Sequence, residues 1–126
     1  MKPIRTPQAI FDQVVEHLLT QGKRSVLDDG LCAYRKEDGS KCAVGCLIPD
    51  ENYYEGLEGG DAYRNDVIAA LPFIADEEIK SLLCHLQDIH DTDEPYLWRE
   101  ALMDLAGELP YITWPTHNYQ GLHCDE

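Results

Sequence analysis

Two cysteines four residues apart, Cys42 and Cys46, are the first residues whose spacing suits a chemical role. Zinc sites commonly combine a short-spaced cysteine pair with a second pair of ligands further along the chain. Cys84 and His90 can supply that second pair, which gives one candidate set of four zinc ligands. Cys42 and Cys46, however, stand among alanine, valine, leucine and isoleucine. Such neighbours favour small buried thiols without a metal.

A cysteine paired with a histidine base is the second candidate chemistry. Cys42 follows a lysine, whose charge stabilises a thiolate, and His90 is followed by Asp91, a carboxylate that can orient the ring. The alternative interpretation is that His90 and Asp91 end one helix and begin the next element. The sequence has no glycine pattern of a nucleotide-binding loop and no serine-hydrolase or zinc-protease motif. We therefore expect no cofactor, and a non-catalytic protein is favoured over an enzyme.

Carboxylates are the most unevenly distributed residue type in the chain. Residues 1–49 hold seven Lys and Arg against six Asp and Glu, a net charge of +1, and residues 50–126 hold three against eighteen, a net charge of −15. A field of that sign repels nucleic acid and anionic membranes and attracts basic partners. The alternative interpretation is that the acidity only keeps the protein in solution.

Eight carboxylates in the acidic part are the residues that we expect to contact a partner. They are Asp50, Glu51, Glu55, Glu58, Asp61, Asp76, Glu77 and Glu78. Tyrosines stand beside the first of them, and aromatic side chains next to carboxylates suit the binding of a basic protein surface. The alternative interpretation of residues 76–78 is a set of solvated charges at the start of a helix.

The elements that position these residues are mostly helical. Apolar residues recur at helical spacing in four segments, which are 7–21, 61–71, 76–90 and 98–106. The turn signal Asp38-Gly39 separates two apolar runs, 31–35 and 41–48, and predicts a short hairpin whose second arm continues into a helical turn near Cys46. The predicted fold is mainly α, with about four helices and one short β-hairpin, or α+β if the hairpin extends.

The length of 126 residues is that of one domain. We expect a single domain over 1–126, in which 110–126 form an extended C-terminal arm that packs through Tyr111, Ile112 and Trp114. Five cysteines, an odd number, accompany a sequence with no recognisable secretion signal and no apolar run long enough for a membrane span. These features predict a cytoplasmic protein with reduced thiols.

Two stretches of the chain form a specific pattern. Residues 32–53 read CAYRKEDGSKCAVGCLIPDENY, which contains C-x-Y-R and G-x-K-C-A-x-G-x-L-I-P-D-x-x-Y, and residues 86–91 read LQDIHD. With HLLTQGKRS at residues 17–25 and the later Trp98, the chain resembles a group of small proteins encoded by bacteria and phages, over roughly residues 8–105. The resemblance implies one intact bacterial or phage domain. It implies no catalytic residue.

Taken together, the sequence predicts a small, acidic, non-catalytic domain that binds another protein. The expected partner is a basic protein surface, such as the groove of a host nucleic-acid enzyme that a phage-type modulator occupies in place of DNA or RNA. Binding of this kind weakens as salt is added. Two alternatives stay open, namely a small enzyme with a Cys/His or zinc site at Cys42, Cys46 and His90, and a small structural component of a virion.

Overall fold

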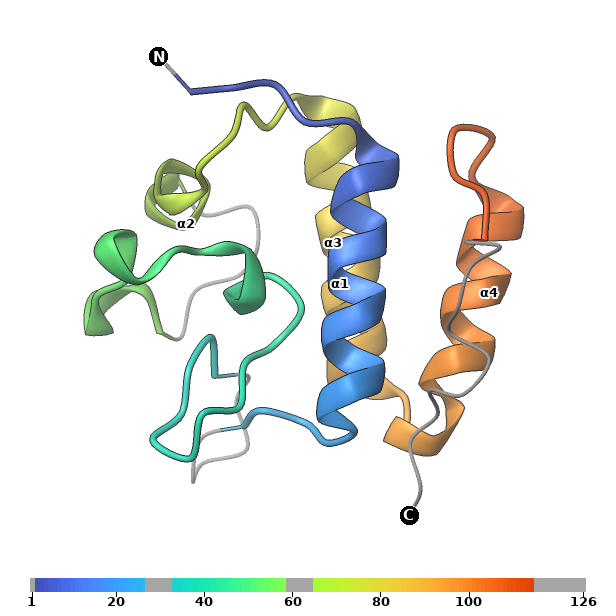
Figure 1. Cartoon of the computed structure of the whole chain (residues 1–126), viewed down its shortest axis with the longest axis horizontal. Helices are drawn as coiled ribbons and strands as arrows, with labels where there is room; N and C mark the ends of the chain where they lie inside the picture. Colours follow the sequence, from blue (N-terminus) through green and yellow to red (C-terminus); the bar gives the residue numbers. More distant parts are fainter. Residues whose placement is uncertain (1, 27–32, 59–64, 115–126) are drawn as a thin grey trace.

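The computed structural model describes residues 2–26, 33–58 and 65–114, and within them the protein is a small, mainly helical single domain (Figure 1). The α-helices of these residues are α1 (Pro7–Gln21), α2 (Asn65–Ala70), α3 (Glu77–Thr92) and α4 (Trp98–Glu108). Short 3-10 helices also occur, and they are η1 (Gly45–Leu47), η2 (Asp50–Asn52), η3 (Glu55–Leu57) and η4 (Pro95–Leu97). No helix of these residues is long and apolar enough to cross a membrane.

Helix α1 begins and ends where its sequence predicts. The Thr6 hydroxyl accepts a hydrogen bond from the amide of Ala9, Pro7 occupies the first turn, and Gly22 ends the helix in the left-handed conformation at φ 70°. Its apolar residues share one face because they repeat at helical spacing. All six are buried, and they are Ile10, Phe11, Val14, Val15, Leu18 and Leu19.

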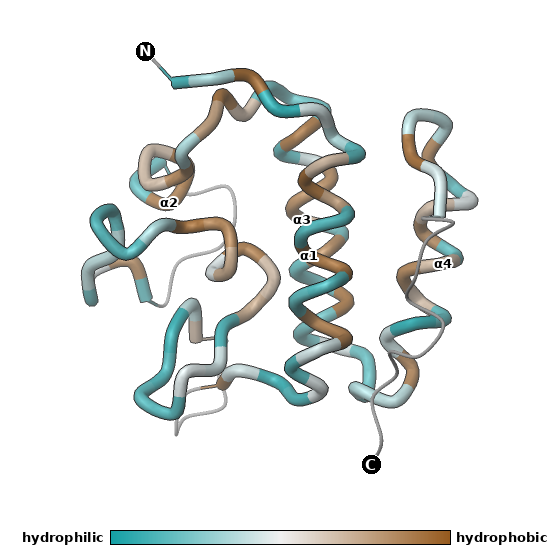
Figure 2. The backbone as a smooth tube through the Cα atoms, in the orientation of Figure 1, coloured by the Kyte–Doolittle hydropathy of each residue, from teal (hydrophilic) through white to brown (hydrophobic). Residues whose placement is uncertain are grey.

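Helices α1, α3 and α4 pack against one another and form the core. Hydrophobic and hydrophilic residues alternate along each of them, as expected of helices with one buried face (Figure 2). The Asp76 carboxylate caps α3 by accepting from the amide of Ile79. Trp98 at the start of α4 is fully buried, and its ring stacks on His90 with 5.6 Å between centroids. The predicted helices of this core are therefore confirmed.

The predicted hairpin is wrong. Among the described residues only Val26 has a β-type pairing, as an isolated bridge, and residues 33–58 are turns and 3-10 helices. The Asp38-Gly39 turn is present, with Gly39 at φ 90°, and the helical turn near Cys46 is η1. The chain does not continue as two paired strands, because the amides of Tyr34 and Arg35 donate to the carboxylate of Glu58 instead of a neighbouring strand.

A close backbone contact between Tyr34 and Gly45, one residue from each predicted arm of the hairpin, holds residues 33–58 in the observed arrangement. A Cβ added at Gly45 would overlap the carbonyl oxygen of Tyr34 and lie 2.8 Å from its carbonyl carbon. Only glycine permits this approach. The contact places η1 directly on the Tyr34 backbone, and a regular second strand cannot occupy the same space.

The predicted C-terminal arm is described only as far as Trp114, and residues 115–126 lie outside the described part. The side chain of Gln8 exchanges two hydrogen bonds with the backbone of Thr113, at 2.7 and 2.9 Å. Ile112 is buried, and the ring of Trp114 meets Phe11 edge-on with 6.2 Å between centroids. These contacts attach the arm to α1.

Candidate functional site

The cysteines of the candidate zinc and nucleophile sites are buried in the core or beside it. Cys42 is fully buried, and its sulfur accepts a hydrogen bond from the amide of Gly45 at 3.3 Å. The Cys46 thiol donates to the carbonyl of Ala43 at 3.1 Å, and burial raises its pKa to about 12. A metal ligand or a nucleophile has to be a thiolate, and Cys46 is a protonated thiol at neutral pH.

No group of three or more His, Cys, Asp and Glu side chains able to hold a metal ion occurs in residues 2–26, 33–58 and 65–114. Cys42, Cys46, Cys84 and His90 all belong to those residues, so the structure does not bring the predicted zinc ligands together. Cys42, Cys46 and Cys84 carry thiols and are not joined in disulfides. Cys32 and Cys124 lie outside the described residues.

His90 is fully buried and both of its ring nitrogens are hydrogen-bonded. Nε2 accepts from the amide of Ser25 at 2.9 Å, so this nitrogen carries no proton. Nδ1 therefore carries the proton and donates it to the Asp91 carboxylate at 2.7 Å. A general base needs a free lone pair directed at its substrate. The lone pair of His90 is already used, so the predicted His90–Asp91 pair positions the chain after α1.

Gln87 is a buried polar residue that the sequence did not single out. Its side-chain oxygen accepts from the amide of Val44 at 3.0 Å, and its amide nitrogen donates to Asp91 at 3.1 Å. Asp91 in turn bonds His90, whose other nitrogen bonds Ser25. One turn of α3 thus accepts hydrogen bonds from backbone amides in two separate loops, at Ser25 and Val44. The LQDIHD stretch therefore has a structural role in this fold.

Arg35 connects the beginning and the end of the sequence pattern at residues 32–53. Its guanidinium donates to the carbonyl of Ile48 at 2.9 Å and pairs with the Asp50 carboxylate at 2.7 Å. The same group lies 4.7 Å from the centre of the Tyr53 ring, a distance at which a cation is attracted to an aromatic face. C-x-Y-R and P-D-x-x-Y therefore meet at one point.

Glu58 completes this contact from the far end of the segment. Its carboxylate accepts from the amides of Tyr34 and Arg35, at 2.8 and 3.2 Å, and from the hydroxyl of Tyr53. Burial and the neighbouring Glu58 carboxylate raise the pKa of Tyr53 to about 12, which keeps the hydroxyl protonated as a donor. We call Arg35, Asp50, Tyr53 and Glu58 the Arg35 cluster.

The predicted partner-binding carboxylates divide into bonded and free groups. Asp50 and Glu58 belong to the Arg35 cluster, Asp76 caps α3, and Glu77 lies 3.7 Å from the ammonium of Lys80. Asp61 lies outside the described residues. The remaining three are exposed and make no hydrogen bond or ion pair within the described residues, and they are Glu51, Glu55 and Glu78.

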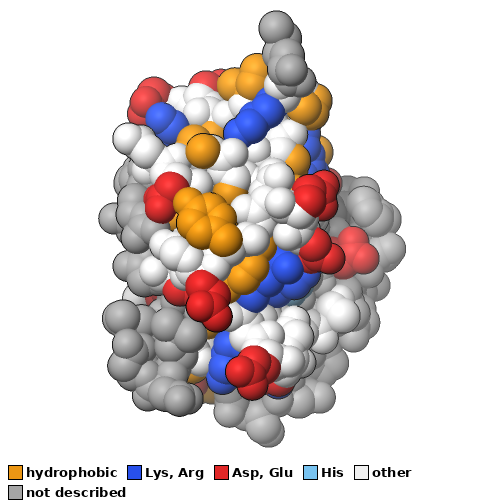
Figure 3. Space-filling model, turned by 90° about the vertical axis from the view of Figure 1, so that its left-hand side faces the viewer, with side chains coloured by type: hydrophobic (Ala, Val, Ile, Leu, Met, Phe, Trp, Pro, Cys, Tyr) orange, Lys and Arg blue, Asp and Glu red, His pale blue; other side chains and the backbone are white. Residues whose placement is uncertain are grey.

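Two of the three free carboxylates flank an exposed aromatic ring. Tyr54 is 52% exposed and stands between Glu51 and Glu55 in the chain. Its ring lies over Gly56, where an added Cβ would come within 2.9 Å of it. Figure 3 looks onto the side of the molecule that carries α2 and these turns, and it shows acidic, basic and hydrophobic side chains interleaved. We call Glu51, Tyr54 and Glu55 the Tyr54 surface.

A hollow of about 890 Å³ adjoins the Tyr54 surface. The described residues that line it are Arg35, Lys36, Glu37, Asp38, Tyr53, Glu55 and Glu58. Three members of the Arg35 cluster thus form part of its wall, and Glu55 belongs to both features. The third free carboxylate, Glu78, lies at the start of α3. Burial, followed by the charge of Glu78, raises the pKa of Tyr111.

Comparisons with known proteins add no relative: no protein-family model, curated protein or solved structure matches this chain. The resemblance to small bacterial and phage proteins stays a prediction.

Proposed function

We propose that this chain is a small acidic domain that binds a basic surface of another protein through the Tyr54 surface. The observation that carries the proposal is the contrast within residues 50–58. Asp50, Tyr53 and Glu58 are bonded into the Arg35 cluster, whereas Tyr54 is half exposed between two carboxylates without partners in the described residues. Exposed tyrosines that are held in place act as anchors in protein interfaces because little side-chain entropy is lost on binding.

Charge supports the same type of partner. Residues 50–126 have a net charge of −15, and a field of that sign accelerates encounter with a basic protein and opposes binding to nucleic acid. The finer proposal is that the partner is a nucleic-acid enzyme whose basic groove receives this surface. An inhibitor or modulator of such an enzyme, of phage or bacterial origin, is the function that we propose.

The test is capture of proteins from a bacterial lysate by immobilised chain and variants, quantified by mass spectrometry. Tyr54→Ala should reduce capture of the true partner by about thirty-fold, the effect of losing an anchor worth about 2 kcal/mol. Glu51→Gln with Glu55→Gln should reduce capture at low salt and have a smaller effect at high salt, where exposed charges are screened.

A double variant on α4, Glu100→Gln with Glu108→Gln, is the matched control. Both residues are exposed, and the net charge changes by the same amount. A partner bound at the Tyr54 surface is captured normally by this control. Equal losses with the control and the Tyr54-surface variants would mean that only overall charge matters and would disprove the proposal.

A further inference from the structure

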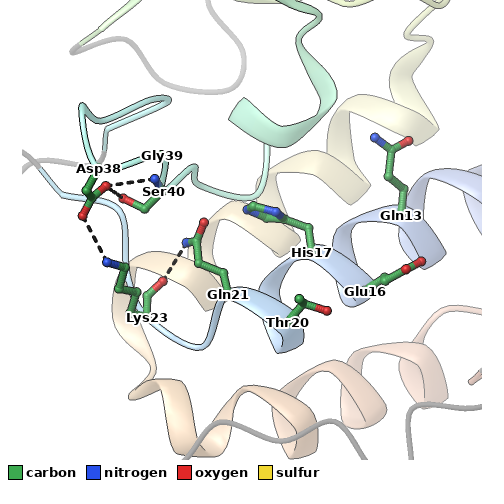
Figure 4. A pocket seen from close by; sticks show the side chains of 9 residues that line it. All are labelled: Gln13, Glu16, His17, Thr20, Gln21, Lys23, Asp38, Gly39 and Ser40. Atoms are coloured by element: carbon green, nitrogen blue, oxygen red, sulfur yellow. Dashed lines mark hydrogen bonds and ion pairs between the residues drawn. The ribbon is translucent and has the colours of Figure 1, made fainter.

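A second hollow, of about 480 Å³, lies between α1 and the turn at residues 38–40 (Figure 4). Its wall on α1 is a polar stripe at helical spacing, opposite the face that α1 buries. The residues that line it are Gln13, Glu16, His17, Thr20, Gln21, Lys23, Asp38, Gly39 and Ser40. None of the chemistry expected from the sequence uses this hollow.

Part of the lining is already saturated with hydrogen bonds. The Gln21 side chain accepts from the amide of Lys41 and donates to the carbonyls of Lys41 and Lys23, at 2.8 to 2.9 Å. The Gln13 side chain donates to Cys46 and accepts from Arg5. These two amides hold the wall in place and have little capacity left for a ligand.

Asp38 and Lys23 neutralise each other across the mouth of the hollow. The Lys23 ammonium lies 3.1 Å from Asp38 Oδ2, and Asp38 Oδ1 accepts from both the amide and the hydroxyl of Ser40. The two bonds from Ser40, followed by Lys23, hold the pKa of the Asp38 carboxyl well below its usual range. The carboxylate is ionised and balances the lysine charge.

His17 adds a free acceptor to the hollow. Its Nε2 lies 2.9 Å from the carbonyl oxygen of Lys41, which only accepts, so Nε2 carries the proton and donates. Burial, the largest cause, lowers the pKa of His17, and the nearby positive charge of Lys41 acts in the same direction. The ring is neutral at pH 7, and its Nδ1 is an acceptor with no partner among the described residues.

Acceptors outnumber donors among the groups that remain. Glu16 is exposed, one helical turn before the Thr20 hydroxyl and next to His17, and its carboxylate has no partner in the part of the chain that the structure describes. Among the described residues that line the hollow, the charges of Asp38 and Lys23 cancel, which leaves Glu16 as the carboxylate without a counterion. A carboxylate, an imidazole Nδ1 and a hydroxyl suit a ligand that only donates hydrogen bonds and carries positive charge.

We propose that this hollow is a binding site for a guanidinium or primary ammonium group. The Glu16 carboxylate supplies the opposite charge, and His17 Nδ1 and the Thr20 hydroxyl accept hydrogen bonds. The group belongs either to a free organic cation or to an Arg or Lys side chain of a bound protein. The site is separate from the Tyr54 surface, so either proposal can fail without the other.

The test is a titration of protein labelled with ¹⁵N at histidine, in which the Nδ1 resonance of His17 reports on occupation. The probes are N-acetyl-arginine methylamide, its neutral analogue N-acetyl-citrulline methylamide, and propylguanidine as a free cation. Before any probe is added, Nδ1 should have the shift of an unprotonated nitrogen. Both cations should move this resonance and the citrulline analogue should not. Tighter binding of the capped arginine indicates a protein side chain, and equal or tighter binding of propylguanidine indicates a free cation.

Glu16→Gln should weaken binding of the arginine probe by about fivefold, the effect expected for one exposed charge pair. Glu100→Gln on α4 removes the same charge from another helix and should leave the affinity within twofold of the unaltered protein. Four results would overturn the proposal: an unmoved Nδ1 resonance, an equal response to the citrulline analogue, equal affinities of the two variants, or a protonated Nδ1 in the free protein.

Discussion

The helical core and the segment of residues 33–58 are stabilised in different ways. In α1, α3 and α4 the backbone bonds itself, and the side chains contribute by burying apolar surface. In residues 33–58 the side chains of Gln87, Glu58 and Arg35 bond backbone groups of this segment that have no strand or helix to pair with. Loss of one core residue leaves a cavity, whereas loss of one of these polar side chains leaves one or two backbone groups without their partner.

The largest effect on stability is expected at the close contact between the backbones of Tyr34 and Gly45. Gly45→Ala places a methyl group against the Tyr34 carbonyl, which cannot move without displacing the segment. We expect a loss of about 3 kcal/mol or more in the free energy of unfolding, comparable to a large truncation in the core. Urea unfolding followed by circular dichroism measures it.

Gly107→Ala is the control for this substitution. Gly107 lies in α4, and a Cβ added there has nothing within 4 Å. Alanine should stabilise the helix by about 0.5–1 kcal/mol. If Gly45→Ala unfolds at the same urea concentration as the unaltered protein, the segment tolerates displacement and its backbone contact is not essential.

Glu58→Gln should destabilise residues 33–58 selectively and leave the helical core largely unchanged. The glutamine keeps one acceptor oxygen, but its amide group faces backbone donors that the carboxylate satisfied. We expect a loss of about 1–3 kcal/mol. Hydrogen exchange should accelerate at the amides of Tyr34 and Arg35 and stay slow in α1 and α3. Uniform acceleration in all helices would show that the helical core and residues 33–58 unfold together. The two regions would then not differ in stability.

Near neutral pH the smallest effect on stability is expected from titration of His17 and Cys46, which lie where the helical core meets residues 33–58. Burial lowers the pKa of His17 from 6.5, so the unfolded chain binds a proton that the folded protein resists. Stability should be complete above about pH 6.5 and decrease below it. Burial raises the pKa of Cys46 from 9.0 to about 12, so the unfolded chain loses its proton first. Stability should therefore decrease again above pH 9, with Tyr53 adding to this from pH 10 upward.

Urea unfolding at a series of pH values measures this plateau, and two variants assign its edges. His17→Gln can keep the hydrogen bond to Lys41 and should remove the contribution of His17 on the acid side. Cys46→Ala should remove the contribution of the thiol on the alkaline side. An acid edge that is the same in His17→Gln would show that another group controls it.

The sequence by itself determined the core helices. Thr6, Pro7 and Gly22 fix the ends of α1, Asp76 fixes the start of α3, and helical spacing fixes the buried faces. These signals act between residues three or four apart, so they can be found without knowledge of the fold. The same applies to the turn at Asp38-Gly39, where a positive φ requires a glycine.

Only the tertiary structure decided the form of residues 33–58 and the roles of their charges. Tyr34 and Arg35 had strand character in the sequence, and the carboxylate of Glu58, more than twenty positions away, removed it by taking their amides. Likewise, Glu51 and Glu58 look alike in sequence, but one is exposed and the other binds backbone. Which carboxylate is free depends on contacts between distant segments, and local spacing carries no information about them.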